Sequence, residues 1–217
     1  MPEEGELWLA TPEAASLFRV QALSDAERER YAGMRSERRR RDFAVSRALL
    51  THLGDAHSVL SSLSHSREHA CVLRGPGVRA LGADLEWHAR RDVLALARFA
   101  FSPPEAEHLA GFDQTERVRL FYSLWVLKEA AAKALGLALL DALQRCTFAL
   151  EDTTLIGELP TSTPWSAYLF APREGFSLGI VMLGSWHCPP PRLAEWPPQT
   201  SAAWAQPLRV RARSLTA

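Results

Sequence analysis

The sequence predicts an α+β protein, and two observations support this fold class. Helical patterns with clear capping residues and blocks of short strand-like segments both occur in each half of the chain. The chain has 217 residues, 47% of them apolar, so it can bury a sizeable core as one large domain or two small ones. The distribution of elements allows two related lobes, although no sequence repeat supports them.

Two helices are predicted in the first quarter of the chain. Ser24 and Glu27 form a capping box that opens a short helix. A second helix is predicted over residues 37–53, with its apolar side chains facing inward and Gly54 as its stop. Strands are expected at residues 70–73 and 78–86, with a turn at 75–77 between them.

The second half begins with helices and continues with strands. A short helix is expected near Asp92, and the segment 102–105 (Ser-Pro-Pro-Glu) combines an N-cap, an N1 proline and an N3 glutamate. The longest helix opens at Asp113 or Thr115 and ends at Gly136. Three further strands are predicted at residues 147–150, 165–170 and 176–183.

The division of the chain follows from this order of elements. We expect an N-terminal lobe at residues 1–101, a C-terminal lobe at 102–186 and a tail at 187–217. The tail contains six prolines and is predicted to be irregular.

Charge and cysteine usage narrow the classes of function. Lys plus Arg and Asp plus Glu both number 25, so no global field draws the protein to nucleic acid or to a membrane. The N-terminal residues do not read as a signal peptide, and no apolar run reaches the roughly 18 residues of a membrane span. Three scattered cysteines form no disulfide framework, which favours the cytoplasm.

Two carboxylates share one face of a predicted strand. In the segment 82–86 (Gly-Ala-Asp-Leu-Glu), alternation points Ala83 and Leu85 into the core and Asp84 and Glu86 to the other side. The two carboxylates are then about 7 Å apart along the strand and can hold one hard cation. The alternative is a solvated face of an edge strand.

The long helix carries a second group of charged residues. Trp125, Glu129 and Lys133 lie on one stripe at i, i+4 and i+8, which an ordinary exposed Glu–Lys pair would also explain. Of the 25 basic residues only Lys128 and Lys133 are lysine, and both lie in this segment. A site that needs one compact cation beside a phosphate favours lysine over the planar arginine fork.

Arginine and histidine supply two further candidates. Eight arginines, Arg38 and Arg39 among them, lie between residues 28 and 47, either as a solvated helix face or as a phosphate-binding face. RNA would also fit such a run, although it lacks interleaved aromatic residues that stack bases. In the segment 63–66 (Leu-Ser-His-Ser), His65 can donate to a phosphate or can be an ordinary surface residue.

In this order, the motifs resemble the Sfp-type 4′-phosphopantetheinyl transferases. The matching segments are 63–66, 82–86 and the Trp-x-x-Lys-Glu-Ala-x-x-Lys-Ala-x-Gly segment at 125–136, of which the last is the most specific. The arginine-rich helix also looks like the N-terminal region of that family. The segment 54–62 is shorter than its usual counterpart there.

The resemblance implies two similar α+β lobes in one chain, with the active site in the cleft between them. It implies a Mg²⁺-dependent transfer of phosphopantetheine from coenzyme A to a serine of an apo acyl-, polyketide- or peptidyl-carrier protein. The enzyme is expected to be a cytoplasmic monomer that binds neither nucleic acid nor membrane. The assigned residues are Asp84, Glu86 and Glu129 for the metal, Glu129 and Lys133 for catalysis, and Arg38, Arg39, Ser64, His65, Lys128 and Lys133 for coenzyme A. The rival functions are a non-catalytic RNA-binding protein and a Mg²⁺-dependent phosphohydrolase or nuclease.

Overall fold

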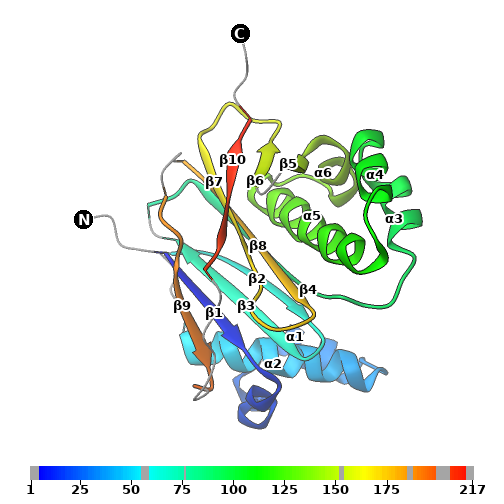
Figure 1. Cartoon of the computed structure of the whole chain (residues 1–217). Coiled ribbons are helices and arrows are strands. Elements are labelled where there is room, and N and C mark those ends of the chain that lie inside the picture. The colour runs from blue at the N-terminus through cyan, green and yellow to red at the C-terminus, as the bar shows by residue number, and fades with distance from the viewer. Residues whose placement is uncertain are drawn as a thin grey trace.

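The computed structural model describes residues 5–54, 59–75, 77–151, 154–184, 188–198 and 206–213. Within these ranges the chain forms ten strands, six α-helices and two short 3₁₀ helices at Pro12–Leu17 and Val20–Ala22. The strands make two sheets, and the helices cover their outer faces (Figure 1). The predicted α+β class is therefore confirmed.

The strands are β1 (Glu6–Ala10), β2 (Leu60–Ser66), β3 (His69–Gly75), β4 (Ala80–Trp87), β5 (Thr147–Glu151), β6 (Thr154–Glu158), β7 (Trp165–Phe170), β8 (Phe176–Leu183), β9 (Arg192–Trp196) and β10 (Leu208–Ala212). The α-helices are α1 (Asp25–Ala32), α2 (Glu37–Leu53), α3 (Val93–Ala100), α4 (Pro103–Ala110), α5 (Gln114–Leu135) and α6 (Leu139–Arg145).

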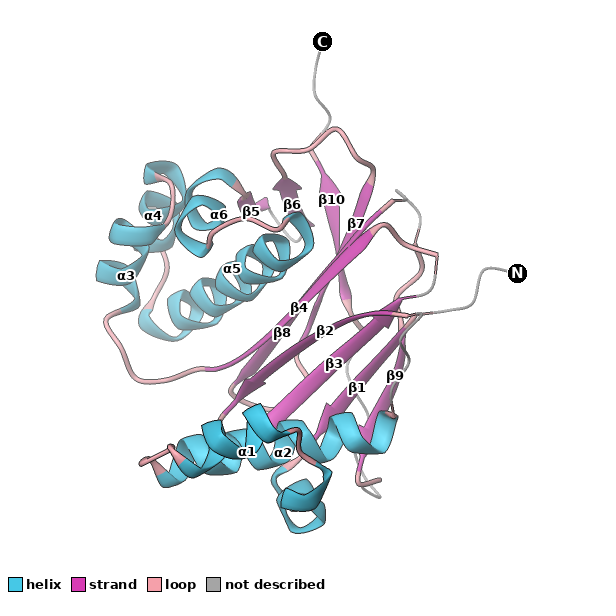
Figure 2. Cartoon of the chain, turned by 180° about the vertical axis from the view of Figure 1, so that it is seen from behind, coloured by secondary structure: helices cyan, strands magenta, loops and turns pink. Residues whose placement is uncertain are grey.

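The first sheet has the strand order β2-β3-β1-β9. Strand β1 runs antiparallel to β3 and parallel to β9. Helix α2 lies along the outer face of this sheet, where Val45 and Leu49 are completely buried in one cluster with Ala70 and Val72 of β3 (Figure 2). The apolar stripe predicted for residues 37–53 thus has its partner surface here.

The second sheet has the order β4-β8-β7-β10-β6-β5. Strand β4 forms one edge and runs antiparallel to β8 over its whole length. The long helix α5 packs on β4 and β8, and the remaining helices of the second half surround it (Figure 2).

The two sheets share a hydrophobic core. Leu9 and Leu73 of the first sheet pack in one cluster with Leu85, Leu178 and Ile180 of the second. This packing brings the edge strands β2 and β4 alongside each other, although they belong to different sheets. Along the seam between these two edges lie Ser64 of β2 and Asp84 and Glu86 of β4, three of the residues that the sequence assigned to the site.

Local signals in the sequence identified most helix ends. The capping box at Ser24 and Glu27 is present, as is the one formed by Ser102 and Glu105. Gly136 ends α5 in the left-handed conformation, with a φ of 66°. Helix α6 and strands β1, β2 and β6 were not among the predicted elements.

The segment after β3 and the tail test two expectations about chain organisation. The chain turns at Gly77 between β3 and β4, as expected, although these two strands belong to different sheets; Pro76 lies outside the described residues. The tail was expected to be irregular, but β9 extends the first sheet beside β1, and β10 lies between β7 and β6 in the second. The second sheet also takes β4 from the predicted N-terminal lobe, and the division at residue 101 stays a prediction.

Candidate active site

Two glycines let helix α5 approach the second sheet closely. A β-carbon added at Gly82 in β4 would lie 2.0 Å from the carbonyl oxygen of Ala130, and one at Gly179 in β8 would lie 2.8 Å from the backbone of Val126. Any other residue at these positions would force the helix away from the strands. The glycines therefore set the distance between β4 and α5.

This close approach brings three carboxylates together. Asp84 and Glu86 come from β4 and Glu129 comes from α5, and one oxygen of each lies within 4.8 Å of the others. Asp84 is only 3% exposed, whereas Glu86 and Glu129 are half-buried. Leu85 points into the shared core, so the predicted division of β4 into a core face and a carboxylate face is confirmed.

The two oxygens of Asp84 have different surroundings. Oδ1 accepts hydrogen bonds from the Ser64 hydroxyl at 2.8 Å and from Lys133 Nζ at 2.9 Å. Lys133 Nζ also donates to the carbonyl oxygen of Ala83 at 2.7 Å. Oδ2 is buried and has no hydrogen-bond partner among the described residues. A buried oxygen of this kind is unfavourable unless another group satisfies it.

The donor set fits a hard divalent cation. Mg²⁺ prefers oxygen ligands and is commonly held by a few carboxylates together with water and substrate phosphate. The unpartnered Oδ2 of Asp84 and the neighbouring oxygens of Glu86 and Glu129 offer such ligands. The residues predicted to bind Mg²⁺ are thus close enough together to do so.

The crowded negative charge changes the acidity of the cluster. Burial raises the pKa of Glu129 to about 7, with a further increase from the Asp84 charge and an opposing effect of Lys133. Burial also raises the pKa of Glu86, followed by the Asp84 charge. A bound cation would reverse both effects, because it favours the ionised carboxylates.

A basic cavity adjoins the carboxylates. One cavity of about 320 Å³ is lined by the carboxylate cluster, Ser64, His65 and Arg47. A second, of about 630 Å³, is lined by Arg35 and Arg39. The two share Arg30, Phe43 and His65 in their walls, so the cavity with the carboxylates adjoins the one lined by arginines of α1 and α2.

Of the residues predicted to bind a phosphate of coenzyme A, some line the two cavities and others do not. His65 lines both cavities, and the partial burial of its ring lowers its pKa, while the charge of Asp42 opposes that change. Both Arg38 and Arg39 are exposed, but Arg39 lines the larger cavity and Arg38 lines neither of the two. Helix periodicity explains this, because neighbouring residues point about 100° apart.

Arg47 was not assigned to the site from the sequence. Its Nε lies 2.7 Å from Glu27 of α1, and its guanidinium carbon lies 4.7 Å from the centre of the Phe43 ring. These contacts hold the side chain in the cavity wall. The spacing of Phe43 and Arg47, one helical turn apart, was the available signal.

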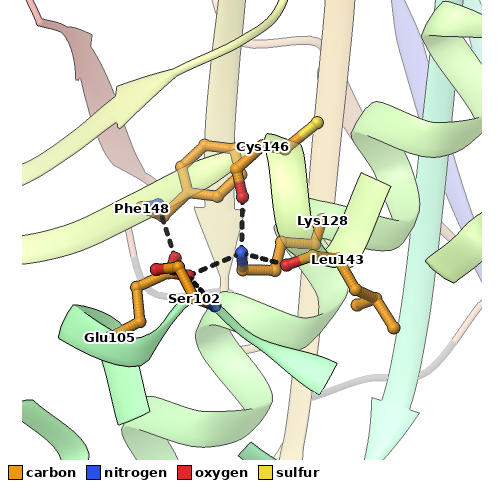
Figure 3. Close-up of polar contacts among 6 residues, drawn as sticks. All are labelled: Ser102, Glu105, Lys128, Leu143, Cys146 and Phe148. Atoms are coloured by element: carbon orange, nitrogen blue, oxygen red, sulfur yellow. Dashed lines mark hydrogen bonds and ion pairs between the residues drawn. The ribbon is translucent and has the colours of Figure 1, made fainter. Parts of the chain in front are cut away.

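Lys128 does not join the other predicted site residues. Its side chain is completely buried on the far side of α5, where Nζ lies 2.9 Å from Glu105 Oε2 and 2.7 Å from the carbonyl oxygen of Leu143 (Figure 3). A third contact goes to the carbonyl oxygen of Cys146. All three acceptors of the Lys128 ammonium group lie inside the protein. The structure therefore gives no support to the expected contact between Lys128 and coenzyme A.

Comparison with known proteins gives one family match and one curated relative. The family model of the 4′-phosphopantetheinyl transferase superfamily matches residues 80–181. The 4′-phosphopantetheinyl transferase HetI of Nostoc sp. (strain PCC 7120) is 30% identical over 137 residues, which cover 61% of this chain and 56% of the relative. The chain thus aligns with just over half the length of that relative.

Two solved structures overlap with half of the chain. The holo-[acyl-carrier-protein] synthase of Thermotoga maritima is 16% identical with a TM-score of 0.40, and the match covers 50% of this chain and 64% of that one. The holo-(acyl-carrier-protein) synthase of Bacillus anthracis, solved in complex with CoA (3′,5′-ADP), is 18% identical with a TM-score of 0.43, and the match covers 50% and 97%.

The matched segment contains the structural centre of the site. Residues 80–181 include β4 with Asp84 and Glu86, and the whole of α5 with Glu129 and Lys133. The resemblance first seen in the short motifs therefore extends over both elements that build the carboxylate cluster. Over this segment the chain is similar to the 4′-phosphopantetheinyl transferase superfamily.

Proposed function

We propose that this protein transfers the 4′-phosphopantetheine group of coenzyme A to a serine of an apo acyl-, polyketide- or peptidyl-carrier protein. The observation that carries the proposal is that the cavity lined by the Asp84, Glu86 and Glu129 carboxylates adjoins an arginine-lined cavity. Coenzyme A is a polyanion with a pyrophosphate and a separate 3′-phosphate. One cleft that offers both a cation site and a basic cavity suits both parts.

The arginine-lined cavity is the proposed site of the 3′-phosphate. His65 and Arg30 border both cavities, and Arg39 lines the larger one. Guanidinium groups bind phosphate through paired, charge-assisted hydrogen bonds. When the 3′-phosphate is held there, the pyrophosphate is directed toward the cavity that is lined by the carboxylates.

The carboxylate cluster is the proposed Mg²⁺ site. When bound, Mg²⁺ offsets the negative charge of the pyrophosphate and of the phosphoryl group under attack. The chain's own contribution is to hold three carboxylates close together. Ser64 and Lys133 fix the orientation of Asp84 through its Oδ1.

Glu129 and Lys133 are the proposed catalytic residues. Glu129 takes the proton of the carrier serine hydroxyl, a form of base catalysis that contributes about 10²–10⁴-fold. The serine oxygen forms a bond to the β-phosphorus, and the bond from that phosphorus to the bridging oxygen breaks, which releases 3′,5′-ADP. Lys133 donates two of its three N–H groups to Ala83 and Asp84, so one remains for a phosphate oxygen.

The proposal includes a cytoplasmic monomer that binds neither membrane nor nucleic acid. No helix among the described residues is long and apolar enough to cross a membrane. Cys71 and Cys146 are free and buried, in keeping with a reducing compartment.

The deciding experiment is intact-mass analysis of apo carrier proteins after incubation with the protein, coenzyme A and Mg²⁺. We expect one phosphopantetheine mass to be added to a carrier, and no addition after chelation of the metal or with Glu129→Gln. Release of phosphate from coenzyme A without a carrier would favour a phosphohydrolase. Binding of RNA that weakens steeply with salt, without any transfer, would favour the RNA-binding alternative.

A further inference from the structure

Three serines of β2 face the edge of β4 across the seam between the sheets. Ser62, Ser64 and Ser66 alternate along the strand and therefore share one face. The strands β2 and β4 are the edges of different sheets. Side chains, not a backbone ladder, connect the two edges, and we call these three residues the serine ladder.

The outer two serines accept hydrogen bonds from the backbone of β4. Ser62 Oγ accepts the N–H of Ala83 at 3.0 Å, and Ser66 Oγ accepts the N–H of Trp87 at 3.1 Å. Unpaired N–H groups along a strand edge need acceptors. These two serines therefore have the same role toward the backbone, one on each side of Asp84 and Glu86.

Ser66 differs from Ser62 in a second contact. Its Oγ also lies 3.0 Å from Glu86 Oε2. An amide N–H can only donate, so Ser66 must act as the acceptor toward Trp87. Its single hydroxyl proton is then available for Glu86, and the carboxylate receives a hydrogen bond of fixed direction.

We propose that Ser66 is a positioning residue that holds the Glu86 carboxylate in its metal-binding orientation. The inference rests on the cation site of the proposed function. Hydrogen bonds to metal-binding carboxylates orient them, and the loss of one such bond typically costs about 10- to 100-fold in metal affinity. Because the Ser66 oxygen is itself fixed by the backbone of β4, it determines where the carboxylate lies relative to the strand that carries it.

Three variants test the inference through Mn²⁺ binding, measured by electron paramagnetic resonance without coenzyme A or carrier. In Ser66→Ala we expect the Kd for Mn²⁺ to rise about 10- to 100-fold. Ser66→Thr keeps the hydroxyl and should bind within a few-fold of the parent. Ser62→Ala is the matched control, because it removes a backbone acceptor on the same strand face but leaves both metal-binding carboxylates of β4 untouched.

A purely structural role predicts a different result. Ser62→Ala and Ser66→Ala would then lower the melting temperature alike and leave the Kd for Mn²⁺ unchanged, which would overturn the inference. A parent protein that binds no Mn²⁺ would overturn it as well. If the parent and variants show the expected order of Kd values but no carrier is modified, the Ser66 inference stands and the transferase proposal fails.

Discussion

Helix α5 carries two lysines in opposite surroundings, and the comparison separates a fold-stabilising charge from one that we propose to be catalytic. Lys128 is completely buried and pairs with the buried Glu105. The Lys133 side chain is 33% exposed and pairs with Asp84 at the edge of the cavity. The same residue type, five positions apart in one motif, thus lies in two different environments.

The number of acceptors around each ammonium group explains the difference. A lysine has three N–H donors. Lys128 has three acceptors, the Glu105 carboxylate and two backbone carbonyl oxygens of the α6 region, and these connect α5 to α4 and to the start of β5. Lys133 has two protein acceptors and one donor left toward the cavity. Only Lys133 can bind a ligand without first losing a contact inside the protein.

The largest expected effect is on stability, at the buried lysine. Lys128→Met removes the cation and leaves the Glu105 carboxylate buried without a counterion, which typically costs about 3–5 kcal/mol. Urea denaturation should report this loss as a lower midpoint. The double variant Lys128→Met/Glu105→Gln should recover part of the loss, because it removes the uncompensated charge.

Lys128→Met could instead have the same urea midpoint as the parent protein and bind coenzyme A more weakly. That result would contradict the contrast between the two lysines. Lys128 would then be a ligand-binding residue after all.

Asp84 is the acidic partner of Lys133, and Glu105 is the acidic partner of Lys128. Neutralising each of them in turn should separate an effect on activity from an effect on stability. Asp84→Asn removes a proposed metal ligand and the ion pair of Lys133, and we expect Mg²⁺-dependent transfer to fall by about 100-fold or more. The fold should persist, because the site lies at the cavity edge. Glu105→Gln is the matched control, and it should lower stability with a much smaller effect on kcat. Near-native turnover of Asp84→Asn with unchanged Mg²⁺ dependence would exclude Asp84 as a ligand.

Arginine at the two lysine positions gives the sharpest form of the comparison. Lys133→Arg keeps the charge and the helix propensity, but a planar fork replaces a compact ammonium group beside the phosphate site. A misplacement of about 1 Å there can cost on the order of 100-fold in kcat, with little change in melting temperature. Lys128→Arg should lower the melting temperature and change kcat little, because the closed surroundings of Lys128 have no room for a guanidinium group.

Turnover and melting temperature of the two arginine variants provide the measurement. If Lys133→Arg turns over like the parent protein, Lys133 has no catalytic role.

A substitution in the arginine-lined cavity should affect only the binding of the 3′-phosphate of coenzyme A. His65→Ala removes a proposed donor to that group, and we expect about a tenfold loss of kcat/KM with coenzyme A. The loss with 3′-dephospho-coenzyme A should be smaller. Arg38→Ala serves as control, since Arg38 lines neither cavity and should leave both substrates unaffected. Equal losses for both substrates in His65→Ala would end this assignment.

The smallest expected effect is a pH dependence of the metal-free protein. The pKa of Glu129 is raised from 4.5 to about 7, mainly by burial. Folding therefore favours its protonated form, and this stabilisation is present below about pH 4.5 and is lost as the pH rises through about 7. We expect the melting temperature of the parent to fall more steeply over this range than that of Glu129→Gln. Mg²⁺ should remove the difference by favouring the ionised carboxylate, and parallel curves for the two proteins would contradict it.

Sequence alone was sufficient for features that depend on neighbouring residues. The capping boxes at Ser24 and Ser102 and the glycine end of α5 were predictable because each involves atoms a few positions apart. The common face of Asp84 and Glu86 followed from strand alternation in the same way. These local rules placed the motif residues on their elements before any tertiary contact was known.

Only the tertiary structure decided what each face meets. Helical geometry places Lys128 and Lys133 about 140° apart around the axis. Which of them faces the cavity depends on β4 packing against one side of α5 and on α4 and α6 against the other. The strands β9 and β10 form for a similar reason, because their partners β1, β6 and β7 lie far away in the sequence. Local propensity and proline content carry no information about such distant edges, so the tail could be recognised as sheet only once the two sheets were in place.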